Sequence, residues 1–183
     1  MNESITLEIA FNEKAEREHQ QFFFRYQWKK GFTELKKAII YALIFLFLGF
    51  FSQSKFINNS PASVVFRYAG FIFIAYIFLL LYQFFTSKKK FYKSIEEQIS
   101  DFKQKDEKFS FIILNKDDIT LENPFNTIVS VWSKTNYKFV DQYLILGILN
   151  NNLNFVFTEH DFKENDYKTF TNFLEQYSKK NKE

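Results

Sequence analysis

The stretch RYAGFIFIAYIFLLLYQFFTSKKK, residues 67–90, decides the fold class. Its residues 68–87 carry no charge, and at about 1.5 Å per residue they form a helix long enough to cross a hydrocarbon layer of roughly 30 Å. Apolar side chains occupy all faces of this helix, whereas a surface helix of a soluble protein is apolar on one face. We therefore expect residues 68–87 to span a membrane rather than to lie in a soluble core.

A second charge-free run, Ala38–Ser54, precedes this stretch and is shorter. It reaches the length of a span by including Leu35 while Lys36 and Lys37 extend their amines toward the membrane surface. Between the two runs, Asn58-Asn59-Ser60-Pro61 is typical of a turn. Two spans joined by a short segment predict a transmembrane helical hairpin.

Lysine and arginine near the spans predict the orientation of the hairpin, because they concentrate on the cytoplasmic side. The connecting segment holds only Lys55 and Arg67, whereas the outer flanks hold Arg25, Lys29, Lys30, Lys36 and Lys37, and then Lys88, Lys89, Lys90 and Lys93. We expect a multi-pass protein of the cell inner membrane with both termini cytoplasmic. A polybasic site for lipid headgroups is the alternative interpretation of the same lysines.

Helical spacing extends into the polar segments on both sides of the hairpin. After the second span, apolar residues recur every three or four positions and predict a helix: Phe91, Ile95, Ile99 and Phe102. Residues 13–30 show similar spacing through His19, Phe22 and Tyr26. This segment is either a helix lying on the membrane surface or the start of a long first span. Within it, Glu18-His19 is interpreted as part of a solvated face.

From Lys108 onward the apolar period changes from helical spacing to alternation. Short alternating runs separated by turn residues predict an antiparallel meander at residues 108–114, 117–123, 127–132, 136–140, 143–149 and 153–157. A closing helix follows, with Asn165 as its N-cap and an apolar stripe of Tyr167, Phe170, Leu174 and Tyr177. The N-terminal run SITLEIAF, residues 4–11, also alternates. Because a lone strand is unstable in water, we expect it to pair with the C-terminal sheet.

The predicted fold class is an α+β membrane protein. A transmembrane helical hairpin is joined to a small antiparallel β-barrel or curved sheet, which the C-terminal helix caps. The expected parts are an N-terminal strand and amphipathic helix at 1–34, the hairpin at 35–87, a helical connector at 88–104, and the β domain with its helix at 105–183.

Three segments of the chain carry a resemblance: FIILNKDDITLENP (111–124), VWSKTNYKFVDQYLIL (131–146) and NFVFTEHDFKENDYKTFTNFL (154–174). With the preceding hairpin, they resemble the YcxB-like family of bacterial membrane proteins, and Trp132-Ser133 is the most recognisable point. Lys134 and Thr135 stand where that family usually has an acidic and an aliphatic residue. The resemblance implies a pleckstrin-homology-like β domain and no established reaction.

Composition argues against most catalytic and binding classes. The chain has no cysteine, which excludes thiolate metal sites and a cysteine nucleophile, and its four glycines are too far apart for a phosphate-binding loop. Glu159-His160-Asp161 is the nearest approach to a metal-binding cluster, but neighbours in an extended segment point to opposite faces. Asp117-Asp118 is interpreted as a hairpin turn rather than a pair of catalytic carboxylates, and Trp132 as a core residue rather than a ligand-facing one. We expect no catalytic, metal or cofactor-binding residues.

The remaining function classes are non-catalytic. Residues 105–183 carry ten lysines and twelve acidic residues, so nucleic acid is not an expected partner. The expected role is an inner-membrane protein whose cytoplasmic β module binds a protein partner or a lipid headgroup, with the lipid bilayer as its surroundings. The alternative is a subunit of an oligomeric membrane assembly involved in transport, including a homo-oligomer.

Overall fold

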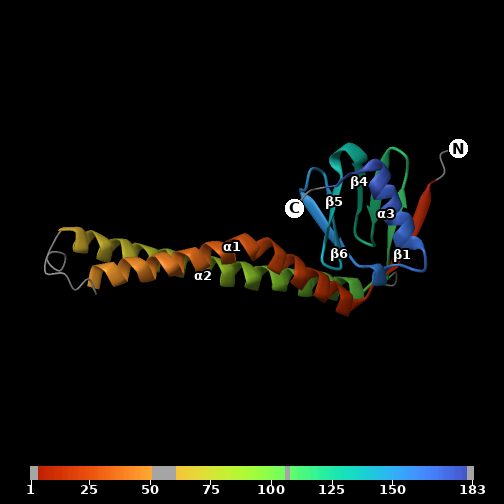
Figure 1. Ribbon diagram of the computed structural model, residues 1–183. Coiled ribbons are helices and arrows are strands. Elements are labelled where there is room, and N and C mark those ends of the chain that lie inside the picture. Colours follow the sequence, from red (N-terminus) through yellow and green to blue (C-terminus); the bar gives the residue numbers. More distant parts are fainter. Residues whose placement is uncertain (1–3, 51–60, 106–107, 181–183) are drawn as a thin grey trace. The chain divides into compact units, whose positions relative to one another are not determined.

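The computed structural model describes residues 4–50, 61–105 and 108–180 of the chain (Figure 1). The chain forms two compact units, here called the β unit (Met1–Phe23 with Ile95–Glu183) and the hairpin unit (Phe24–Ser94). Two long helices, α1 (Glu13–Phe50) and α2 (Pro61–Lys103), contribute residues to both units. Helices and antiparallel sheets together make the fold α+β, as the sequence predicts.

The β unit contains two four-stranded sheets, and the predicted closure into a barrel is wrong. The first sheet has the order β1-β2-β3-β4 and the second has the order β7-β6-β5-β8. Only β8 runs parallel to its neighbour among the described strands. The strands are β1 (Ile5–Ala10), β2 (Phe109–Leu114), β3 (Asp118–Glu122), β4 (Thr127–Val131), β5 (Asn136–Val140), β6 (Tyr143–Ile148), β7 (Leu153–Phe157) and β8 (Lys179–Lys180).

The change of sheet between β4 and β5 explains why no barrel forms. A 3-10 turn, η1 (Trp132–Lys134), follows β4 directly and carries the buried Trp132. The Trp132 indole N–H donates to the carbonyl of Asn115 at 2.9 Å. This turn redirects the chain, so that β5 pairs with β6 and β8 rather than continuing the ladder of β4.

The N-terminal strand pairs with the C-terminal part of the chain, which confirms the sequence-based prediction. β1 runs antiparallel to β2 with Ile5 opposite Leu114 and Leu7 opposite Ile112. Leu7 is 2% exposed, whereas its neighbour Thr6 is exposed. The alternation predicted from residues 4–11 therefore buries one face of β1 in the core of the β unit.

The closing helix α3 (Asp166–Tyr177) covers the apolar core of the β unit. Phe170 and Leu174 are fully buried in it, and the core also holds Leu7, Ile112, Leu114, Ile119, Leu121, Trp132, Tyr137, Leu144, Leu146 and Ile148. Asn165 is the N-cap, as predicted, but it adopts a left-handed conformation (φ 64°) and its side chain makes no capping hydrogen bond. The backbone carbonyl of Asn165 instead accepts hydrogen bonds from the N–H and the hydroxyl of Thr169.

The hairpin unit consists of α1 and α2 packed side by side and antiparallel (Figure 1). α1 is unbroken from Glu13, so residues 13–30 are the start of a long helix rather than a separate surface helix. Pro61 begins α2, where its fixed φ suits the first turn of a helix. The predicted turn residues 58–60 lie outside the described residues, as do residues 51–54 of the first apolar run.

Small residues allow α1 and α2 to approach each other closely. Ala38 and Ala42 are buried between the helices. A Cβ added to Gly49 would lie 2.8 Å from Arg67 Cγ and 3.0 Å from the Arg67 backbone nitrogen, and one added to Gly70 would lie 2.6 Å from Leu46 Cδ2. The Arg67 Nε–H donates to the Gly49 carbonyl at 2.8 Å. These contacts set the register of the two helices.

Candidate membrane-binding surface

The outward side chains of the hairpin unit form an extended apolar surface. Between residues 39 and 50 on α1 and between residues 64 and 85 on α2, most large apolar side chains are exposed. Leu43, Phe78 and Tyr82 are 64%, 68% and 72% exposed, respectively. Large contiguous apolar surfaces are rare on soluble monomers and mark contacts with lipid or with other proteins.

Within the described residues, one helix, α2, is long and apolar enough to cross a membrane. The second span expected from the sequence lies in α1, which does not meet the same criterion. Its charge-free part, from Ala38 to Phe50, covers about 20 Å as a helix, and Glu34, Lys36 and Lys37 precede it. The composition of α1 alone therefore does not support a second span.

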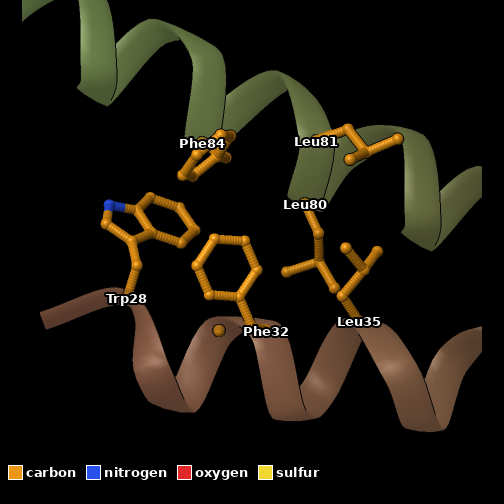
Figure 2. A pocket seen from close by; sticks show the side chains of 7 residues that line it. Trp28, Phe32, Leu35, Leu80, Leu81 and Phe84 are labelled. Atoms are coloured by element: carbon orange, nitrogen blue, oxygen red, sulfur yellow. The ribbon is translucent and has the colours of Figure 1, made fainter. Parts of the chain in front are cut away.

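A small apolar groove lies between the two helices near the cationic end of the hairpin unit (Figure 2). Trp28, Phe32 and Leu35 on α1 point toward Leu80 and Phe84 on α2. The Trp28 and Phe32 rings each lie 5.2 Å from the ring of Phe84, between centroids. This aromatic cluster packs α1 against α2 at this end of the hairpin unit.

In the β unit, the structure brings together two residues that the sequence analysis kept apart. His19 Nε2 on α1 lies 3.3 Å from Asp161 Oδ2, and each side chain is 9% exposed. The interpretation of Glu18-His19 as a solvated face is therefore wrong for His19. The imidazole also packs edge-on against the ring of Tyr143, which stacks on Phe22. The apolar stripe through His19 and Phe22 was the sequence signal for this buried face.

Asp161 has a structural role in a turn of the β unit. Residues Glu159–Asp161 form the 3-10 turn η2, not the extended segment assumed from the sequence. Asp161 Oδ2 accepts hydrogen bonds from the backbone N–H of Thr158 at 2.6 Å and from its hydroxyl at 3.0 Å. The carboxylate thus caps this turn and holds the first turns of α1 through His19.

The other residues singled out in the sequence also have structural contacts. Asp118 begins β3 and accepts a hydrogen bond from the Asn115 side chain at 2.8 Å, so Asp117-Asp118 belongs to the β2–β3 hairpin turn as predicted. Trp132 is 5% exposed and stacks on Tyr177, which confirms its core position. Within the described residues, no group of three or more acidic or histidine side chains could hold a metal ion.

Charged contacts join the start of α1 to the end of α2 within the β unit. Glu13 accepts hydrogen bonds from Lys103 at 2.6 Å and from Arg17 at 2.8 Å. These two bonds lower the pKa of Glu13, because they favour its charged form. Arg17 also pairs with Glu96, and Phe11 stacks on Phe102 nearby. Both chain segments that flank the hairpin unit are thus held in the β unit.

Comparison of the chain with protein-family models, with curated proteins and with solved structures finds no match.

Proposed function

We propose that this chain is a bacterial inner-membrane protein, anchored by α1 and α2 as a two-span hairpin with both termini cytoplasmic. In this proposal the β unit is a non-catalytic module that binds a protein partner or a lipid headgroup. The resemblance to the YcxB-like family and its pleckstrin-homology-like domain belongs to the same proposal. Four strands (β1–β4), three further strands (β5–β7) and the covering helix α3 support that part of it, and the two-residue strand β8 is additional.

The pairing of β1 with β2 is the observation that carries the proposal. Residues 5–10 precede α1 and residues 109–114 follow α2, yet these strands are hydrogen-bonded neighbours. The two segments must therefore lie on the same side of any membrane, so the chain between them crosses it an even number of times. If α2 crosses, α1 is the element available for the return crossing. The topology thus favours a hairpin even though α1 is less apolar than α2.

In this proposal the polar residues singled out in the sequence have structural roles. Asp118, Asp161 and Trp132 each have a structural partner, as described above. The hydrogen bonds of these residues stabilise turns and the core.

Single-cysteine labelling tests the proposed topology, and the absence of natural cysteines makes each label unique. Three exposed positions suit the experiment: Ser4 before β1, Ala62 at the start of α2, and Thr127 in the β unit. In intact cells with a permeable outer layer, a membrane-impermeant maleimide should label Ala62→Cys and should label Ser4→Cys and Thr127→Cys only after lysis. Labelling of all three positions before lysis, or of Ser4→Cys and Thr127→Cys from opposite sides, would contradict the hairpin.

The second candidate function is a subunit of an oligomeric membrane assembly involved in transport. An open apolar groove near the Gly49–Arg67 contact favours it, because a neighbouring copy could fill this groove within the bilayer. It is lined by Leu43, Leu46, Phe47, Phe50 and Phe71. Crosslinking in native membranes separates the two candidates. Copies of this chain linked through the hairpin unit would favour the assembly, whereas a different protein in a fixed ratio, linked through residues 108–180, would favour the binding module.

A further inference from the structure

The base of the hairpin unit concentrates positive charge. Nine lysine and arginine residues in the segments 25–37 and 88–93 stand against one acidic residue, Glu34, which gives a net charge of +8. We call these nine residues the basic collar. Glu34 pairs with Lys37 at 3.1 Å, and Lys88 lies over the ring of Tyr92. Glu34 is thus the one acidic residue within these two segments.

Three members of the collar form a row on α1. Arg25, Lys29 and Lys36 are four and seven residues apart, a spacing that places them along one side of a helix. All three side chains are exposed, and no acidic residue pairs with them in the described part of the chain. Such a row presents several cations in one direction, which suits a surface of phosphate groups.

The register of the hairpin places this row beside an apolar surface. Tyr41 on α1 contacts Phe73 on α2 at 5.4 Å between ring centroids, and Phe32 contacts Phe84 at 5.2 Å. Lys36 lies between Phe32 and Tyr41 along α1. It is therefore level with residues of α2 between Phe73 and Phe84, inside the charge-free run. At this level one helix is cationic and the other is apolar.

The exposed side chains of α2 at the same level are large and apolar. Phe78, Tyr82 and Phe85 are all more than three-fifths exposed. A phospholipid has a phosphate group next to acyl chains, so a cationic row beside an exposed apolar surface matches both of its parts. Lys36 lies deeper along the hairpin than Lys88–Lys90, because the charge-free run of α1 is shorter than that of α2. Arg25 lies near the other end of the row, since its neighbour Phe24 contacts Phe91 and Tyr92.

From this juxtaposition we propose that the base of the hairpin is a binding site for anionic phospholipid of the surrounding bilayer. The row of Arg25, Lys29 and Lys36 extends about 16 Å along α1 and binds the phosphates of neighbouring headgroups. Phe78, which is level with Lys36, contacts their acyl chains, and Tyr82 and Phe85 lie nearer the headgroups. This inference rests on the membrane insertion proposed above. It explains how α1 keeps Lys36 and Lys37 near the membrane, since lipid phosphates drawn toward these amines replace the water that they would otherwise require.

Fluorescence of Trp28 provides a direct test. The chain has two tryptophans; Trp132 is buried in the β unit, whereas Trp28 lies in the groove beside the collar. The full-length protein is reconstituted into vesicles of phosphatidylcholine and phosphatidylglycerol at one fixed ratio. Two samples of the same lipid composition are compared. In the first, the phosphatidylglycerol carries bromine atoms on its acyl chains, which quench tryptophan fluorescence, and in the second the phosphatidylcholine carries them. The ratio of the two quenching efficiencies then reports which lipid contacts Trp28.

We expect brominated phosphatidylglycerol to quench Trp28 more strongly than its share of the lipid predicts. Each cation near an anionic surface favours binding by about fivefold, so the anionic lipid should be enriched at least about fivefold around the collar. The variant R25Q/K29Q/K36Q should lose this enrichment. The control K108Q/K168Q/K179Q removes the same charge from exposed positions of the β unit and should retain it.

Two results would overturn the lipid site and leave the membrane anchor standing. One is quenching in proportion to the lipid ratio in the wild-type protein. The other is an equal loss of enrichment in both triple variants, which would assign the effect to the overall charge. Absence of quenching by either brominated lipid would contradict the membrane anchor itself, and the lipid site with it.

Discussion

Replacing Leu7 by alanine tests whether the N-terminal strand is an integral part of the β unit. The Leu7 side chain is 2% exposed and lies opposite Ile112 across the β1–β2 ladder. Leu→Ala at a buried site destabilises proteins by about 2–5 kcal/mol, because transfer free energy is lost and a cavity remains. We expect the free energy of unfolding of the β unit to fall by this amount. That fall corresponds to about a 30-fold to 5,000-fold larger fraction of open molecules.

Hydrogen–deuterium exchange of the full-length protein in detergent micelles measures this change. Peptides from residues 109–122 should exchange faster in Leu7→Ala by the same factor, because amide exchange in a core strand follows its opening free energy. Thr6→Ala is the matched control. Thr6 is exposed on the opposite face of β1, so its replacement should change stability by less than about 0.5 kcal/mol. The reasoning is refuted if Leu7→Ala leaves the exchange of residues 109–114 within about threefold of wild type.

Three further predictions follow from other contacts. Phe170→Ala should lower the free energy of unfolding of the β unit by about 3–5 kcal/mol in urea unfolding, since Phe170 is fully buried; the exposed Lys168→Ala serves as control. Gly49→Val should separate the helix ends, because its side chain would meet the backbone of Arg67; loss of an engineered disulfide between α1 and α2 at this end would measure it. Burial, and then the nearby carboxylate of Glu175, raises the pKa of Tyr137 above its ordinary value of 10.0. The neutral phenol therefore stabilises the fold below about pH 10, and this contribution is lost as the pH rises further. Above about pH 10 the urea midpoint should decrease less with pH in Tyr137→Phe than in the wild-type protein. An equal decrease in both proteins would contradict this prediction.

Helices and strands were predicted correctly where the periodicity of apolar residues within a short segment was sufficient to identify them. The alternation in residues 4–11, the change of period at Lys108 and the stripe through Phe170 and Leu174 each specified a strand or helix that the structure contains. Such patterns report which face of an element is apolar, and this depends only on the order of residues along the chain. The pairing of β1 with the C-terminal sheet could also be predicted, because an isolated strand requires a partner, whereas its partner strand β2 is known only from the structure.

The tertiary structure decided what each apolar or polar face contacts. The apolar stripe through His19 indicated a buried face, but only the tertiary structure shows that Asp161 and Tyr143, from distant segments, cover it. Strands β1 to β7 were predictable one by one, whereas β8, which pairs with β5, was not. The division of the strands into two sheets depends on the turn at Trp132.

The sequence by itself determined the two apolar helices, their cationic flanks, the short strands and the closing helix, because these follow from local period and composition. Only the tertiary structure decided the register of α1 against α2, which places Lys36 beside an apolar part of the neighbouring helix. It also decided that both flanks of the hairpin meet in one sheet. The physical reason is that packing and strand pairing depend on the free energies of contacts between residues far apart in the chain. The sequence of a single segment does not contain that information.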